Sequence, residues 1–356
     1  MTSGTRGVPN ASHIDLYRLM KLIRRTEEIL IDEYHPADEM RCPIHFCVGQ
    51  EATPAALAQV LRPDDVLASH YRSHGYYLAK GGSLRAMVAE FYGKATGANG
   101  GLAGSMELGA HDLHFSSGAI VGGSVLIPLG SAFAQKYRGG DGISVSVLGD
   151  GALDEGVVYE VMNLAALHRL PVLFICENNG YAAHTPVERR AASTKLAGRA
   201  EAFGVPARKL DGNDALLLLR ELKAAESTVR SGGGPAYVEV LTYRYCAHVG
   251  PGDDQALGYR TDAEIETWRK RDPIVKLWDT LVEAGAEAKD LLEIDRAVDL
   301  EVRAAIAAAK AAPWPTLDDA LAANWSNTYS PAVTRFITDV SGEFKGGQSE
   351  TRLAPY

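Results

Sequence analysis

Two apolar runs, ISVSVL at 143–148 and PVLFIC at 171–176, constrain the fold of this chain more than any other feature. Each has the length and the nearly continuous apolar character of a buried strand in a parallel sheet. The segment between them has apolar residues at helical spacing, at Val158, Val161, Ala165, Leu167 and Leu170. A strand, a helix and a second strand form a β-α-β unit, which places the two strands parallel in one sheet. The chain is therefore predicted to be an α/β protein.

The remainder of the sequence fits the same fold class. A further strand is predicted at 236–245, after the turn SGGGP, and an amphipathic helix at 14–34. The last part of the chain is rich in Ala, Leu and Glu, which predicts helices packed outside the sheet. Because no internal repeat or low-complexity linker is present, one α/β domain with C-terminal helices is predicted at 14–335. Residues 1–13 are expected to be flexible, and the polar residues 336–356 to form a loose tail.

The charge of the chain excludes one large class of partner. Lys and Arg total 36 against 45 Asp and Glu, a formal charge of −9, whereas a protein that binds nucleic acid through phosphate contacts needs a basic surface. The most apolar stretch, AIVGGSVLIPLGSAFA, is interrupted by three Gly and one Pro. It is interpreted as buried backbone, and no membrane span is expected. The N-terminus lacks the apolar core of a signal peptide, so a cytoplasmic location is expected.

The four cysteines, Cys42, Cys47, Cys176 and Cys246, show no paired spacing that would predict disulfides, which suits a reducing compartment. Cys42, His45 and Cys47 lie close together and raise the question of a zinc site. Because structural zinc sites usually add a second pair of ligands, packing within a loop is the preferred interpretation.

The triplet Gly-Asp-Gly occurs twice, at 140–142 and 149–151, on opposite sides of the first predicted strand. Asp141 precedes the strand, where Asp and Gly favour a tight turn. Asp150 follows the strand at its carboxyl end, the edge where open α/β sheets bind ligands. Its flanking glycines allow a phosphate to approach the backbone, and the helix that follows favours an anion at its N-terminus. Asp150 is therefore the predicted functional residue of the two.

The second strand ends in ENNGY, so Asn179 and the backbone of Tyr181 emerge at the same edge as Asp150. Asp150 and Asn179 are 29 residues apart, the length of one strand–helix–strand passage. A carboxylate, an amide oxygen and a main-chain carbonyl are the hard oxygen ligands that Mg²⁺ prefers, with phosphate oxygens completing its shell. The spacing predicts a magnesium and phosphate site at this edge.

A Gly-Asp-Gly triplet followed by a helix and by Asn-Asn at a strand end resembles the thiamine diphosphate (ThDP) motif. The stretch GDGALDEGVVYEVMNLAALHRLPVLFICENNGYAAHTP is similar to the α subunits of the two-subunit 2-oxo acid dehydrogenase E1 enzymes, which serve the pyruvate, branched-chain and acetoin complexes. The similarity runs from about residue 15 to about residue 325 and includes HFCVGQEA, HYRSHGYYLAKGG, TYRYCAH and YRTDAEIETWRKRDPI. It implies a ThDP-binding fold with a central, mostly parallel sheet flanked by helices.

The resemblance also assigns residues to the cofactor. It implies that Asp150, Asn179 and the Tyr181 carbonyl hold Mg²⁺, and that the backbone at Gly151 and Ala152 lies against the diphosphate of ThDP. The predicted domain would therefore be the diphosphate-binding half of a ThDP enzyme.

Two further pairs follow from the same resemblance. Tyr71 and Arg72 resemble the pair that grips the diphosphate, and a guanidinium matches phosphate oxygens in two-pronged fashion. The main chain at Ala119 and Val121 corresponds to positions that meet the aminopyrimidine ring.

Two histidines, His45 and His248, resemble active-site residues beside the reactive thiazolium carbon. A histidine whose pKa is near neutrality can transfer protons or stabilise charge that develops on the substrate. His70, His74 and His184 are possible helpers without an assigned role.

The resemblance implies decarboxylation of a small 2-oxo acid and transfer of the acyl unit either to the lipoamide of a lipoyl E2 protein or to an aldehyde acceptor. In two-subunit members of the family, the glutamate that activates ThDP comes from a β subunit of an α₂β₂ heterotetramer, so this chain alone is expected to be silent. Glu51, in GQEA, is interpreted as a structural residue of its motif. Two alternatives stay open: a split carboligase or transketolase-like enzyme without a lipoyl acceptor, and a non-catalytic ligand-binding subunit.

The sequence departs from the family pattern near the predicted site. Cys246-Ala247-His248-Val249 stands where the family loop often reads His-Gly-His-Ser, so the serine that some mitochondrial enzymes phosphorylate is absent. Ala103 and Glu107 replace the usual Gly and His of GxGGSMH. These changes leave the cofactor residues intact and leave the identity of the 2-oxo acid open.

Overall fold

The computed structural model describes residues 11–34, 40 and 42–323. The chain divides into two compact units, Met1–Trp314 and Pro315–Tyr356. The first unit contains the sheet and every residue predicted for the cofactor site.

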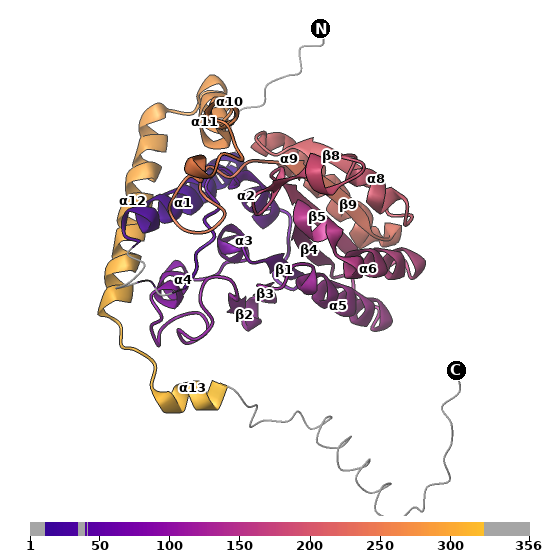
Figure 1. The fold of residues 1–356 in the computed structure, drawn as a ribbon, viewed down its shortest axis with the longest axis horizontal. Helices are drawn as coiled ribbons and strands as arrows, with labels where there is room; N and C mark the ends of the chain where they lie inside the picture. Colours follow the sequence, from indigo (N-terminus) through magenta and orange to yellow (C-terminus); the bar gives the residue numbers. More distant parts are fainter. Residues whose placement is uncertain (1–10, 35–39, 41, 324–356) are drawn as a thin grey trace, which may run out of the picture. The chain divides into compact units, whose positions relative to one another are not determined.

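The first unit is built around a seven-stranded sheet in the order β2-β3-β1-β4-β5-β9-β8 (Figure 1). All neighbouring strands are parallel except β2 and β3, which are antiparallel. The strands are β1 (Val66–His70), β2 (Gly109–Ala110), β3 (Phe115–Gly118), β4 (Ser144–Gly149), β5 (Val172–Asn178), β8 (Ala207–Asp211) and β9 (Ala236–Leu241). The predicted mostly parallel sheet flanked by helices is confirmed.

Helices cover both faces of this sheet, which explains why the residues of β5 up to Cys176 are apolar throughout rather than alternating, and why even the serines of β4, Ser144 and Ser146, are buried. In β5, Val172 and Phe174 pack on one face, and Leu173 and Ile175 on the other. Helices α5 (Leu126–Tyr137), α6 (Gly156–Leu167) and α8 (Ala197–Glu201) cover the first face. The other face is covered by α2 (Ala52–Ala58), α3 (His74–Ala79) and α9 (Ala215–Thr228).

The predicted β-α-β unit is confirmed as β4, α6 and β5, with Ser144 of β4 opposite Val172 of β5 in parallel register. Val158, Val161 and Ala165 of α6 are buried, as their spacing predicts. The prediction for Leu167 is wrong, because its side chain is 71% exposed. It lies about 200° around the helix from Ala165, on the face turned away from the sheet.

The predicted N-terminal helix is confirmed as α1 (Ala11–Asp32). Its side chains at Leu16, Met20, Ile23 and Leu30 are buried, in the i, i+4 and i+7 spacing of an amphipathic helix. Helix α12 (Ala288–Ala311) packs against α1 and against α4 (Leu84–Phe91) (Figure 1). With α10 (Asp262–Arg269) and α11 (Pro273–Glu283), it forms the predicted C-terminal helical layer.

The strand predicted at 236–245 ends earlier, because β9 stops at Leu241. The chain then crosses to the segment that carries His45, where the Tyr245 N–H donates to the Val48 carbonyl over 2.9 Å. Gly49 permits this crossing: its φ is +95°, and a Cβ atom there would lie 2.4 Å from the Tyr243 carbonyl oxygen.

The second unit is represented by one described helix, α13 (Leu317–Ala323). The predicted tail at 336–356 lies outside the described residues, as do residues 1–10 of the predicted N-terminal segment. No helix in the described part of the chain is long and apolar enough to cross a membrane.

Candidate functional site

The sheet has a topological switch point between β1 and β4. The chain leaves β1 toward β3 on one side, whereas it leaves β4 toward β5 on the other, and ligands of open α/β sheets bind at such crevices. A cavity of about 550 Å³ lies at this edge. Every predicted site residue lines it: His45, Tyr71, Arg72, Ala119, Val121, Asp150, Gly151, Ala152, Asn179, Tyr181 and His248.

Asp150 begins the short 3₁₀ turn η3 (Asp150–Asp154) directly after β4, and its side chain is 1% exposed. One carboxylate oxygen accepts a hydrogen bond from Arg190 Nη2, while Arg190 Nη1 donates to the Asp150 carbonyl over 3.1 Å. Burial raises the pKa of Asp150 to about 6, against the opposing effect of the Arg190 charge. Sequence reasoning missed Arg190, because nothing in its local sequence links it to a residue 40 positions earlier.

The other triplet lies at the opposite end of β4. Asp141 has a side chain 72% exposed, and it pairs over 2.7 Å with the exposed Arg62. The tight turn predicted at Asp141 is wrong in its position: the turn lies at Arg138 and Gly139, at the end of α5, and residues 140–143 form no turn. Asp141 therefore belongs to the connection between α5 and β4, away from the cavity.

A chain of hydrogen bonds joins the ends of β1 and β5 in the cavity wall. Asn179 Nδ2 donates to Gln50 Oε1 over 3.4 Å, and Gln50 Nε2 donates to Glu177 Oε2 over 3.2 Å. His70 Nε2 lies 3.0 Å from the same Glu177 oxygen. The Tyr181 N–H donates to Asn179 Oδ1, so the network orients the Asn179 amide. Gln50 and Glu177 are site residues that sequence reasoning did not single out.

The donor set at this edge fits a magnesium ion bound to diphosphate. The buried carboxylate of Asp150 and the amide of Asn179 line the same cavity, and these are hard oxygen ligands. A Cβ atom at Gly149 would meet nothing within 4 Å, so the backbone there is open to a ligand. At Gly151 a Cβ atom would lie 2.8 Å from Ala182 Cβ, so that position accommodates only glycine without a shift.

Arg72 is 4% exposed and is held by the main chain of two other segments. Its Nη1 donates to the Phe46 carbonyl over 2.5 Å, and its Nη2 donates to the His248 carbonyl over 3.1 Å. Its own N–H donates to His70 Nδ1 over 3.1 Å. A guanidinium has five N–H donors, and these side-chain bonds use two of them.

The rings of His45, Tyr71 and His248 pack together in the cavity wall. The His45 and His248 centroids are 5.1 Å apart, and those of His45 and Tyr71 are 4.5 Å apart. Burial, followed by the charge of Arg72, lowers the pKa of His45 to about 2 and that of His248 to about 4. Both histidines are therefore neutral at pH 7, which contradicts the near-neutral pKa expected from the sequence.

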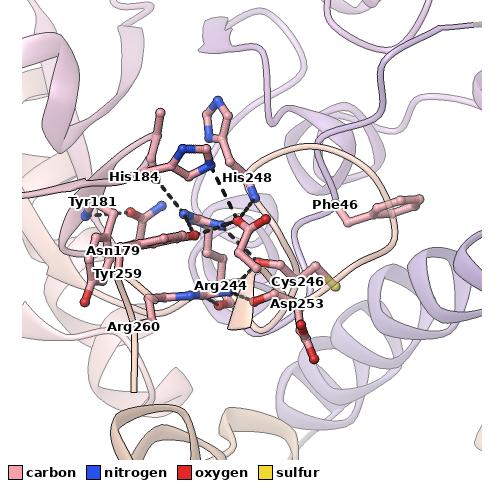
Figure 2. Close-up of polar contacts among 12 residues, drawn as sticks. Phe46, Asn179, Tyr181, His184, Arg244, Cys246, His248, Asp253, Tyr259 and Arg260 are labelled. Carbon is pink, nitrogen blue, oxygen red and sulfur yellow. Dashed lines mark hydrogen bonds and ion pairs between the residues drawn. The ribbon is translucent and has the colours of Figure 1, made fainter. Parts of the chain in front are cut away.

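The loop after β9 is ordered by buried arginines and one aspartate. Asp254 Oδ2 accepts hydrogen bonds from the His248 N–H over 2.8 Å and from the Tyr259 hydroxyl over 2.6 Å. Arg244 donates to the same oxygen over 3.3 Å, and Arg260 donates to the Arg244 carbonyl over 2.7 Å. Figure 2 shows Arg244 and Arg260 reaching toward the loop that carries His248. These contacts hold His248 in the cavity although the loop departs from the family pattern.

The divergent residue Glu107 also touches the site. The Ala119 N–H donates to Glu107 Oε1 over 2.7 Å, at the main chain predicted to meet the aminopyrimidine. Beyond it, Ile120 is 75% exposed and Val121 is 45% exposed at the cavity edge.

All four cysteines are free thiols, as predicted. The Cys42 thiol donates to the Phe91 carbonyl over 3.7 Å. Cys47 instead lies with Glu27 and His74, whose ligand atoms are within 4.8 Å of one another and of the Cys47 sulfur. The Glu27 carboxylate already accepts the Cys47 N–H and contacts His74 Nδ1, both over 2.8 Å. Cys42 and Cys47 therefore contact different segments, and packing as the role of this loop stays a prediction.

Comparison with known proteins identifies similar chains over most of this length. The family model described as dehydrogenase E1 component matches residues 18–318. The α subunit of the pyruvate dehydrogenase E1 component, somatic form, mitochondrial, of Rattus norvegicus is 39% identical over 305 residues, which cover 85% of this chain and 77% of that protein. The corresponding α subunit of Rhizobium meliloti is 38% identical, over 82% of each chain. That of Zymomonas mobilis is 36% identical, over 85% of each chain.

Proposed function

Because the chain belongs to the dehydrogenase E1 component family, we propose that it is the diphosphate-binding half of a two-subunit enzyme that acts on a small 2-oxo acid. It is the α subunit of a ThDP-dependent 2-oxo acid dehydrogenase E1 component. The observation that carries the site assignment is the convergence of its residues: segments that follow β1, β3, β4, β5 and β9 all line one cavity at the switch point.

Bound ThDP would supply the electron sink for loss of CO₂ from the 2-oxo acid. Asp150, Asn179 and the Tyr181 carbonyl would hold Mg²⁺, and the Arg72 guanidinium and the Gly151 backbone would contact the diphosphate. The Tyr181 hydroxyl bonds to Glu264 outside the cavity lining, which is consistent with a role for its main chain. The Arg72 charge and the N-terminus of α6 both favour an anion at this position.

The two neutral histidines would act as hydrogen-bond partners rather than as cations. Each neutral imidazole offers one N–H donor and one acceptor nitrogen. His45 and His248 lie together at the cavity wall, so they can hold the carboxylate or carbonyl oxygen of the substrate and exchange a proton with it. Asp254 accepts a hydrogen bond from the main-chain N–H of His248 and so fixes the backbone that carries this ring.

A second subunit is needed to complete this site. After β9, the described residues form only helices and loops, so they contain no second α/β domain for the aminopyrimidine half of ThDP. An apolar face of α5 and α6, which lie side by side (Figure 1), extends from the cavity edge. The exposed apolar side chains are Leu126, Ile127, Phe133 and Tyr137 of α5, Leu164 and Leu167 of α6, and Ile120 and Val121 of the segment between β3 and α5.

A face of this kind is expected to be covered in the working enzyme, because large exposed apolar patches mark interaction sites. A Cβ atom at Gly130 would meet nothing within 4 Å, so another helix can approach α5 closely there. We assign this face to a β subunit of an α₂β₂ heterotetramer, with Ile120 and Val121 joining the interface to the cavity. The four free cysteines fit a cytoplasmic enzyme.

Pyruvate is the first substrate to test, because the relatives above are α subunits of pyruvate dehydrogenase. A lipoyl E2 protein is the proposed acceptor, and an aldehyde acceptor would indicate a carboligase. This chain by itself should not decarboxylate any member of a panel of 2-oxo acids, and it should gain activity when a β subunit of a two-subunit E1 enzyme is added. Robust turnover by the single chain would contradict the two-subunit assignment.

The interface can be tested separately by co-purification. Phe133→Asp places a charge on the apolar face, where Phe133 is 49% exposed, and should abolish co-purification with that β subunit. Leu300→Asp is the matched control, because Leu300 is 70% exposed on α12. Equal recovery of the partner with both variants would exclude the α5–α6 face as the interface.

A further inference from the structure

Arg190 connects the two loops that supply the proposed metal ligands. It is the last residue of the short helix α7 (Val187–Arg190), which follows the Asn179 loop and the hairpin of β6 (Tyr181–Ala182) and β7 (Thr185–Pro186). From there it reaches back to the turn after β4, where it bonds to the Asp150 carboxylate and carbonyl. Its side chain is only 10% exposed.

The same guanidinium also contacts a second carboxylate. Arg190 Nη1 donates to Asp154 Oδ2 over 2.6 Å, and the Asp154 side chain is 34% exposed and is shared with Arg199. The Nε–H of Arg190 is buried and has no hydrogen-bond partner among the described residues. One N–H group of Arg190 therefore has no acceptor in the described part of the chain, although the guanidinium bonds to Asp150. The same guanidinium is already bonded to a second carboxylate, that of Asp154.

A buried carboxylate requires a positive partner, and at Asp150 that partner is Arg190. If Asp150 also binds a divalent cation, as the proposed function states, two positive charges share one buried carboxylate. Their repulsion is strong in a site shielded from water. Each positive charge must then weaken the binding of the other.

We propose that Arg190 is the built-in counter-cation of Asp150: it neutralises the carboxylate in the metal-free protein and opposes divalent cations that bind there. This inference rests on the proposed function, because it takes Asp150 as a metal ligand. Asp154 provides the carboxylate onto which Arg190 shifts its hydrogen bonds when the cation arrives. Arg190 is thus a positioning residue that sets the affinity of the site.

The test compares Arg190→Gln, which removes the charge but keeps a hydrogen-bonding group, with Arg190→Lys, which keeps the charge. Mn²⁺ is used in place of Mg²⁺, because its free concentration can be measured by electron paramagnetic resonance. Each variant of the chain is titrated with Mn²⁺ in the presence of ThDP. Arg190→Gln should bind Mn²⁺ on the order of tenfold more tightly, because one unit charge is removed beside a divalent ion. Arg190→Lys should bind as the parent does. Arg189→Gln is the matched control, because the exposed Arg189 carries the same charge one residue away.

Thermal unfolding supplies a second readout. In EDTA, the Tm of Arg190→Gln should be lower than that of the parent, because the buried Asp150 carboxylate loses its counter-charge. Saturating Mn²⁺ and ThDP should reduce this difference in Tm. The inference is overturned if Arg190→Gln binds Mn²⁺ with the same affinity as the parent or with a lower one. Asp150→Ala separates this result from failure of the proposed function: if it binds Mn²⁺ and ThDP as the parent does, Asp150 is not a ligand and both proposals fail.

Discussion

Replacing Asp150 by alanine should both destabilise the protein and remove its cofactor affinity. Asp150 is 1% exposed and its partner Arg190 is 10% exposed, so the substitution leaves a buried guanidinium without its main counter-charge. Breaking such a buried pair costs about 3–5 kcal/mol. Because Arg190 keeps its bond to Asp154, the lower end, about 3 kcal/mol, is expected.

This loss of free energy can be converted into a melting temperature. The unfolding entropy is about 2.1 cal/mol/K per residue, or roughly 0.65 kcal/mol/K for a unit of the size of Met1–Trp314. A loss of about 3 kcal/mol therefore lowers Tm by about 5 °C. Mg²⁺ and ThDP at about 100 times Kd should raise the Tm of the parent by about 4 °C, since they add about 2.7 kcal/mol. The same ligands should not change the Tm of Asp150→Ala.

Differential scanning calorimetry with and without ThDP and Mg²⁺ measures both effects. Asp141→Ala is the control, because Asp141 belongs to the other Gly-Asp-Gly triplet and pairs with Arg62 at the surface. The Tm of this variant, and the rise in Tm on adding ThDP and Mg²⁺, should equal those of the parent. An Asp150→Ala protein with the parental ligand shift would remove Asp150 from the site.

His248→Ala should lower kcat strongly and change ThDP affinity little, because the His248 carbonyl, not its ring, bonds Arg72; a normal rate in steady-state kinetics would contradict its role. The lowered pKa of His248, about 4, means that the unfolded chain binds more protons than the folded one between about pH 6.5 and pH 4. The unfolding free energy should therefore fall as pH drops through this window, and denaturant titrations should show a smaller fall in His248→Ala. Gly151→Ala should lower Tm and weaken ThDP binding, because the added Cβ atom would lie 2.8 Å from Ala182 Cβ. Gly149→Ala is the control and should keep the parental Tm, because a Cβ atom there meets nothing within 4 Å. Equal Tm values for the two glycine variants would show that the contact at Gly151 relaxes without cost.

The local elements of the fold could be predicted from the sequence. The β4-α6-β5 unit follows from residue periodicity and from the lengths of the apolar runs, both of which depend only on neighbouring residues. The same reasoning places Asp150 and Asn179 at one edge of the sheet, since parallel strands bring their carboxyl ends together. The residue assignments at Tyr71, Arg72 and His248 came from resemblance to a family, not from periodicity.

Only the tertiary structure decided which distant segments meet. The strand β1 (Val66–His70) is too short and mixed to be predicted, and its place beside β4 creates the switch point. Arg190 reaches Asp150 because two loops lie side by side, and the pKa values of His45 and His248 depend on burial and on Arg72. Pairing of strands, burial and charge partners are set by distances in space, and sequence separation carries no information about those distances.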